Sequence, residues 1–207
     1  LNAATYGRAQ EGLLEVRGAL VVKPGVKLQV RTEFFKPHHF ASPSRWNQVY
    51  FRPGSGGSTV TGSGGLNKFY VSTGSDSAVE FTDLDQDYLY IDNSAVTLTR
   101  GKEIHVDSLQ GDRSFIARNV NLLSLQMEDG QVYSGKMKVT ECKAVYFGLT
   151  LGANADAKFD LIGVNTNDGG VGGSAEVRSG AKLLVDNSVS ICGNPISLHL
   201  TGDPPGE

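Results

Sequence analysis

The 207-residue sequence predicts an all-β fold, most of it a right-handed β-solenoid that follows a short N-terminal helix. Glycine accounts for 26 of the 207 residues, which exceeds the average usage of about 7%. Asn, Asp, Ser and Thr are also frequent, and long runs of helix-forming residues are scarce. Apolar residues alternate with polar ones in short segments separated by small turns, as they do in half-buried strands.

The N-terminal segment is the one place where the sequence favours a helix. Asn2 is a suitable N-cap, and Ala3, Ala4 and Ala9 have high helix propensity, whereas Gly7 weakens the helix by about 1 kcal/mol. We therefore expect residues 1–13 to form a helical segment and residues 14–207 to form the β domain.

The β domain begins with LEVRGALVVKPGVKLQV, in which apolar residues recur at two-residue spacing and Pro24-Gly25 marks a turn. Strands this short suit stacked turns of a coil, each strand pairing in parallel with the strand of the next turn. The alternation predicts an interior made of Leu20, Val22, Val26, Leu28, Phe51, Ile91, Val96, Leu98, Leu122, Leu125, Leu183 and Val185.

Two of these segments, VRGALVVKPGVKLQV and WNQVYFRPGSGGSTV, resemble the repeating unit of right-handed parallel β-helix proteins from bacterial surfaces. The segment AEVRSGAKLLVDNSVSI is similar to repeats of autotransporter-type passenger domains. This resemblance implies an architecture and no particular activity, because β-helices carry many unrelated functions. An ordinary antiparallel β-sandwich remains the alternative.

The layout of the chain also resembles the exported part of a type IV pilin or pseudopilin: an N-terminal helix, an all-β body and a cysteine pair near the C-terminus. In that family the first, hydrophobic half of the helix is removed to obtain soluble protein, and a chain that opens at Leu1 fits such a cut. The resemblance implies an extracellular or cell-surface location.

The two cysteines, Cys142 and Cys192, are 50 residues apart, too far for a CxxC redox pair. In an exported protein we expect them to form a disulfide, which contributes on the order of 4 kcal/mol by chain entropy. The alternative is a pair of unpaired, buried thiols in a cytoplasmic protein.

The densest acidic cluster comprises Asp83, Asp85 and Asp87. Alternate carboxylates on an extended segment project to one face, where they can bind Ca²⁺ or act as acid and base. The EF-hand pattern fails, since Tyr88 and Ser94 occupy its glycine and glutamate positions. We favour solvated turn carboxylates and predict neither a metal nor a cofactor.

The candidate ligand-binding residues are Tyr50, Arg52, Tyr88 and Tyr90. Exposed aromatic rows can stack on sugars or, beside basic residues, on nucleic-acid bases. Tyrosine also prefers strands for structural reasons alone, so burial within the sheet is the alternative.

The net charge of −3 gives no overall attraction to nucleic acid or to an anionic membrane, and no apolar run approaches the roughly 18 residues of a membrane span. The sequence carries no specific catalytic motif. We expect a non-catalytic surface or appendage subunit, an adhesin or a large minor pilin-like protein. Its partners are sister subunits or an extracellular polymer, carbohydrate or DNA. A polysaccharide lyase or hydrolase on a β-helix and a phage tail spike or fibre are the alternatives.

Overall fold

The computed structural model describes the backbone of residues 13–14, 27–28, 47–51, 58–61, 67–72, 78–164, 166–191 and 195–202, with side chains from residue 69 onward. All of the described regular structure is β. The strands are β1 (Leu13–Leu14), β2 (Lys27–Leu28), β3 (Asn47–Phe51), β4 (Ser58–Thr61), β5 (Asn67–Ser72), β6 (Ala78–Leu84), β7 (Asp87–Asp92), β8 (Ala95–Gln110), β9 (Phe115–Gln126), β10 (Lys136–Thr140), β11 (Ala144–Leu151), β12 (Asp156–Asp160), β13 (Gly170–Arg178), β14 (Lys182–Asp186) and β15 (Ile196–Thr201).

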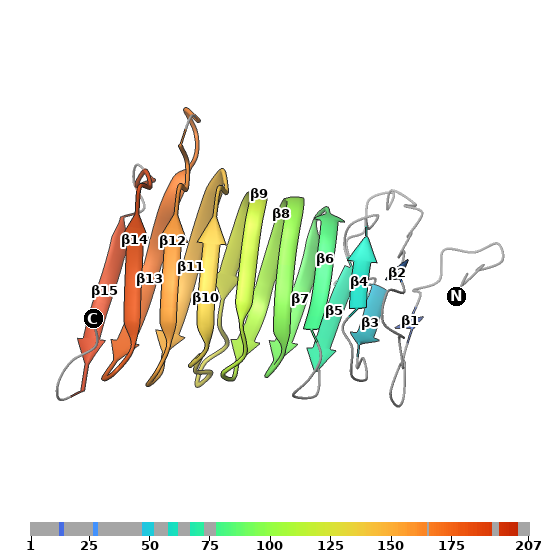
Figure 1. The fold of residues 1–207 in the computed structure, drawn as a ribbon, viewed down its shortest axis with the longest axis horizontal. Coiled ribbons are helices and arrows are strands. Elements are labelled where there is room, and N and C mark those ends of the chain that lie inside the picture. The colour runs from blue at the N-terminus through green and yellow to red at the C-terminus, as the bar shows by residue number, and fades with distance from the viewer. Residues whose placement is uncertain are drawn as a thin grey trace, which may run out of the picture.

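The strands form a β-solenoid with two facing sheets (Figure 1). Sheet 1 contains β2, β4, β6, the first halves of β8 and β9, β10, β12 and β14; sheet 2 contains β1, β3, β5, β7, the second halves of β8 and β9, β11, β13 and β15. The chain runs up sheet 1 and down sheet 2 as it advances, which is the right-handed sense. Every pairing between described strands is parallel, so the solenoid prediction is confirmed and the antiparallel sandwich is wrong.

A single residue with positive φ bends the chain where it leaves sheet 1. These residues lie above one another in successive turns, with φ between 45° and 60°; they are Asp83, Arg100, Asn119, Glu141, Leu161 and Asn187. Because the left-handed conformation reverses the side-chain direction, the residue that follows it points inward. Leu84, Val120, Cys142 and Ile162 hold that interior position and are buried.

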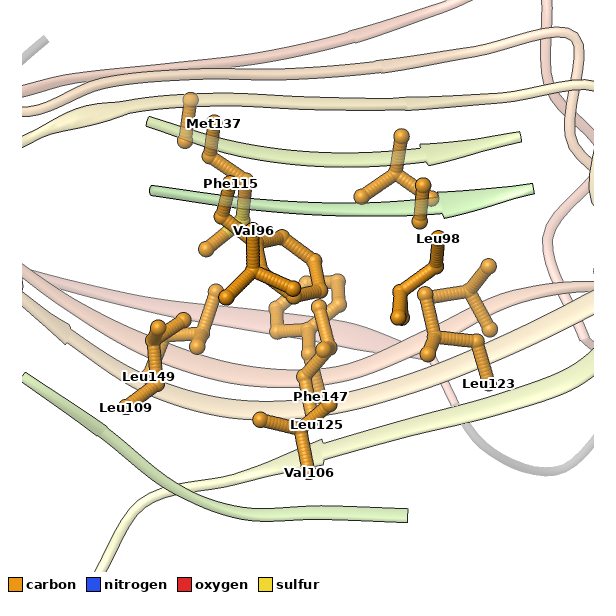
Figure 2. Packing of buried hydrophobic residues seen from close by; sticks show 14 of the residues in the cluster. Val96, Leu98, Val106, Leu109, Phe115, Leu123, Leu125, Met137, Phe147 and Leu149 are labelled. Carbon is orange, nitrogen blue, oxygen red and sulfur yellow. The ribbon is translucent and has the colours of Figure 1, made fainter. Parts of the chain in front are cut away.

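The core fills the space between the sheets with stacked apolar side chains, as Figure 2 shows for Val96, Phe115 and Met137 on sheet 1 and Val106, Leu125 and Phe147 on sheet 2. Four of the predicted interior residues are buried, namely Ile91, Val96, Leu98 and Leu125, while Leu183 and Val185 pack against the core. Leu20, Val22 and Val26 lie outside the described residues, as do the side chains of Leu28 and Phe51.

Leu122 was assigned to the interior wrongly. Its neighbour Leu123 is fully buried and Leu122 is half-buried on the outer surface. The buried residues of β9 are Phe115, Ala117, Val120, Leu123 and Leu125, so the alternation shifts at the bend at Asn119 and shifts back between Val120 and Leu123, which leaves Leu122 on the outside.

Residues 1–12 of the predicted helical segment lie outside the described residues. Its last residue, Leu13, belongs to β1, which pairs in parallel with β3. Within the described part of the chain, no helix has the length and apolarity needed to cross a membrane.

The structure does not support the predicted disulfide, because Cys142 is a free thiol; Cys192 lies outside the described residues. Cys142 occupies the interior position that follows the bend, and its Sγ lies 3.5 Å from the carbonyl oxygen of Thr140. Burial raises the pKa of the Cys142 thiol to about 11. The thiol is therefore protonated and acts as a small apolar side chain.

Cys142 should make the stability of the protein fall at alkaline pH. Its folded-state pKa exceeds the ordinary value of 9.0, so its contribution is complete below pH 9 and is lost as the pH rises towards 11. We expect the free energy of unfolding of wild type to fall more steeply over this window than that of Cys142→Val, as measured by urea denaturation.

The same thiol tests the disulfide directly. Cys142 should resist a thiol reagent at pH 8 in the native protein and react once the unreduced protein is unfolded. If no thiol titrates in the unfolded, unreduced protein, the two cysteines are joined and the free thiol is contradicted.

Candidate ligand-binding site

The acidic cluster does not form a single site. Asp83 accepts two hydrogen bonds from Arg100, at 2.8 and 3.0 Å, and Asp85 pairs with Lys102 at 2.7 Å. Asp87 is buried and accepts a hydrogen bond from the backbone N–H of Asp85. The projection of all three carboxylates to one face was predicted wrongly, because positive φ angles at Asp83 and Gln86 interrupt the extended backbone.

The charge pairs explain how the acidic cluster is held. The guanidinium of Arg100 lowers the pKa of the Asp83 carboxyl, so Asp83 is ionised. Its negative charge is balanced by the positive charge of Arg100 in the adjacent turn. Both side chains are about half exposed, and such pairs contribute less than about 1 kcal/mol each. Within the described residues, no group of three or more metal-ligating side chains comes together.

The predicted tyrosines form short ladders on the outer surface of sheet 2. Tyr90 stacks on Tyr70 with ring centroids 4.7 Å apart, and Tyr88 stacks on His105 at 4.6 Å. The Tyr90 hydroxyl donates to Asp107, and burial with the nearby Asp107 carboxylate raises the Tyr90 pKa.

The stacking limits what these tyrosines can bind. Each stack covers one face of both of its rings, so it stabilises neighbouring turns and leaves less ring surface on which a ligand can stack. Tyr50 is in register with Tyr70 and so continues the ladder at the backbone level, but its side chain and the whole of Arg52 lie outside the described residues.

A groove with a volume of about 480 Å³ crosses the outer surface of sheet 2 further towards the C-terminus. It spans β11, β13 and β15 and is bordered by the loop that follows β9. Its lining residues are Gln126, Met127, Glu128, Asp129, Gly130, Gln131, Gly148, Leu149, Thr150, Ser174, Ala175, Glu176, Arg178, Ser197 and His199.

Two outward-facing ladders make the floor of this groove. Gly148, Ser174 and Ser197 are in register across the three strands, and beside them lie Thr150, Glu176 and His199. The ladder of Gly148, Ser174 and Ser197 has the smaller side chains, so the outer surface of the sheet is recessed along it. The second ladder supplies hydroxyl, carboxylate and imidazole groups at successive strands, about 4.8 Å apart.

The 127–131 loop forms one wall, and Gln131 holds it in place. The Gln131 Oε1 accepts hydrogen bonds from the backbone N–H groups of Leu109 and Glu128, both at 3.2 Å. Its Nε2 donates to Ser108 at 2.7 Å and to Glu128 at 3.3 Å. The amide therefore ties the loop both to β8 and to its own first residues.

Replacement of Gln131 should loosen this wall. Gln131→Ala removes four hydrogen bonds and leaves the Leu109 N–H and the Ser108 hydroxyl without this partner. We expect a loss of about 1–3 kcal/mol in the free energy of unfolding, together with faster amide exchange in residues 127–131. Gln126→Ala, at the exposed end of β9, is the control and should change stability by less than about 0.5 kcal/mol.

The groove is acidic in balance. Three acidic residues, Glu128, Asp129 and Glu176, line it together with Arg178 and His199. Arg178 donates to Glu176 at 2.9 Å, and Thr201 also donates to it at 3.3 Å. These bonds, chiefly the one from Arg178, lower the pKa of Glu176, which is therefore a fixed acceptor and a poor proton donor.

The groove was not predicted from the sequence. The residues that form its floor are separated by more than 20 positions, and they come together through strand register alone. One local signal was present: the polar, glycine-containing QMEDGQ segment after a strand, which is typical of a loop standing out from the sheet.

Comparison with known proteins provides no relative. No protein-family model, no curated protein and no solved structure matches the chain.

Proposed function

We propose that this chain is a non-catalytic module of a cell-surface or appendage protein, of adhesin or large minor pilin type, that binds a neutral, hydroxyl-rich polymer. The observation that carries the proposal is the groove across β11, β13 and β15, with its regularly spaced polar groups. An extracellular glycan is the ligand class with this chemistry.

The shape of the groove favours an extended ligand. From the end of β9 to β15 the groove crosses four adjacent strands, about 14 Å along the solenoid axis at a strand spacing of about 4.8 Å. The parallel strand ladders hold the floor rigid, so little conformational entropy is lost when a ligand binds. A polymer running along the axis meets a hydrogen-bonding side chain at each strand.

The charge of the groove favours a neutral polymer over a polyanion. Three carboxylates line it, and its arginine is already engaged by Glu176. A nucleic acid or a polyuronate brings further negative charge and meets repulsion. Carboxylates and side-chain amides are good partners for sugar hydroxyls.

The electrostatics favour binding over glycan cleavage. A glycosidase needs a carboxylic acid whose pKa is raised so that it can protonate the leaving group. The shift at Glu176 has the opposite direction, because Arg178 stabilises the ionised form.

The proposal is tested by affinity electrophoresis in native gels that contain soluble neutral polysaccharides, with polygalacturonate and double-stranded DNA as polyanions. The blocking variant is Ser174→Trp, which fills the floor. Its matched control is Ser124→Trp, on the outer surface of the same sheet but outside the groove lining. Wild type and Ser124→Trp should be retarded by at least one neutral polysaccharide, and Ser174→Trp should migrate freely.

Retardation by the polyanions alone contradicts the assignment of a neutral ligand. Equal retardation of Ser174→Trp and wild type contradicts the groove as the site. Release of reducing ends during incubation contradicts a non-catalytic role and favours the hydrolase alternative.

A further inference from the structure

The two methionines of the chain lie in different surroundings. Met137 is buried in the core, in register with Phe115 (Figure 2). Met127 is half-buried: it packs against the core and also lines the groove. Among the described residues the remaining sulfur atom is that of Cys142, which is buried. In that part of the chain, Met127 is therefore the sulfur-containing side chain that a small oxidant in the groove meets first.

Met127 lies where the 127–131 loop leaves the sheet. Its backbone N–H donates to the Gly148 carbonyl at 3.2 Å, and the chain rejoins the ladder at Tyr133, whose N–H donates to the Thr150 carbonyl at 3.0 Å. In a regular parallel ladder the N–H of Thr150 donates to the backbone carbonyl of Met127. Here it donates to the Sδ of Met127, at 3.3 Å. The thioether thus takes the place of a backbone acceptor beside Thr150, a residue of the groove floor.

This sulfur atom holds the first residue of the groove wall against β11, as Gln131 holds the last residue against β8. A thioether is a weak acceptor, and the contact depends equally on its apolar packing against the core.

Oxidation of the sulfur disturbs both interactions. An N–H···O bond needs about 2.9 Å between nitrogen and oxygen, so an added oxygen does not fit between the Met127 sulfur and the Thr150 nitrogen at 3.3 Å. An oxygen turned towards the core would be a buried polar atom without a partner. The sulfoxide is therefore accommodated only if the side chain leaves this position and turns its oxygen to solvent.

We propose that Met127 is an oxidation site for hydroperoxides and that its sulfoxide releases the 127–131 wall, which switches off ligand binding in the groove. With hydrogen peroxide, an S–O bond forms at Sδ as the O–O bond breaks. The sulfur gives up an electron pair, and the displaced oxygen leaves as water with the proton of the transferred oxygen. The loss of binding rests on the proposed function, whereas the release of the wall rests on the contacts of Met127 alone.

The test is treatment of the folded, full chain with dilute hydrogen peroxide, followed by peptide mapping and hydrogen exchange measured by mass spectrometry. Wild type should gain one oxygen atom at Met127 before Met137, and amide exchange in residues 127–131 should become about threefold faster or more. Met127→Leu should show no peroxide-dependent change in this exchange. Met137→Leu, the matched substitution in the core, should respond to peroxide as wild type does.

Ligand binding is followed in native gels that contain neutral polysaccharide. Oxidised wild type should be retarded less than the untreated protein, with an affinity about threefold weaker or more. Methionine sulfoxide reductase with a dithiol should restore both the retardation and the slow exchange, since the sulfoxide oxygen leaves as water while the dithiol becomes a disulfide.

Oxygen uptake at Met137 before Met127 overturns the proposal, as does unchanged exchange in residues 127–131 once Met127 is oxidised. Equal acceleration in wild type and Met127→Leu also overturns it, and equal retardation before and after oxidation overturns the switch. A wild type that no neutral polysaccharide retards contradicts the proposed function alone, because peptide mapping and exchange need no ligand.

Discussion

Leu98→Asp should unfold the protein or remove most of its stability. Leu98 is fully buried and stacks in register between Phe81 and Ala117 of the adjacent turns. A carboxylate in that position has no polar partner, and an unpaired buried charge costs several kcal/mol. A single domain has about 5–15 kcal/mol in total, so we expect loss of the cooperative transition in urea.

Thr97→Asp is the matched control for this change. Thr97 is the preceding residue of the same strand and lies half-exposed on the outer surface. The same new carboxylate should cost no more than about 1 kcal/mol there. Equal destabilisation by the two variants would show that the assignment of inner and outer positions is wrong.

Gly173→Ala should be almost as damaging, although it adds a single methyl group. Gly173 has a φ of 139°, which side chains rarely adopt, and an added Cβ would lie 2.0 Å from the carbonyl oxygen of Phe147 in the next strand. The backbones of β11 and β13 must separate to admit it. We expect a loss of about 3 kcal/mol or more, measured by urea denaturation.

Gly130→Ala is the control that separates the two causes of destabilisation at Gly173, the steric clash of the added Cβ and the unfavourable backbone conformation. Gly130 also has a positive φ, 83°, but no atom lies within 4 Å of an added Cβ. Its cost should be about 1 kcal/mol, that of the left-handed conformation alone. A Gly173→Ala variant no less stable than Gly130→Ala contradicts the close approach of β11 and β13.

The fold was predictable from the sequence because its main signal is local. Alternation with frequent turns shows short half-buried strands, and Ile91, Val96 and Leu98 follow that pattern directly. The pattern fails where the chain bends, since a single left-handed residue resets it. For this reason Asp87, which follows Gln86, is buried although it was predicted to be exposed. Leu122 was misassigned because the alternation shifts twice in the corner of β9, once at Asn119 and again before Leu123.

The site was not predictable, because it depends on the lengths of the turns. Asp83 and Arg100, one turn apart, are separated by 17 residues, and Ile162 and Ser188 by 26. Without a constant period, a sequence does not show that Gly148, Ser174 and Ser197 are neighbours. The tyrosines were recognisable as a group, but their mutual stacking follows from the register between turns.

We propose that the groove, and not the tyrosine ladder, receives the ligand. The most direct measurement is a titration of the ¹⁵N-labelled protein, followed by amide chemical shifts, with a soluble oligosaccharide of whichever neutral polysaccharide retards it in gels. The predicted result is a set of shifts centred on Gly148, Ser174, Ser197 and the 127–131 loop, with Tyr88 and Tyr90 unchanged. Shifts centred on Tyr88, Tyr90 and His105 would contradict it.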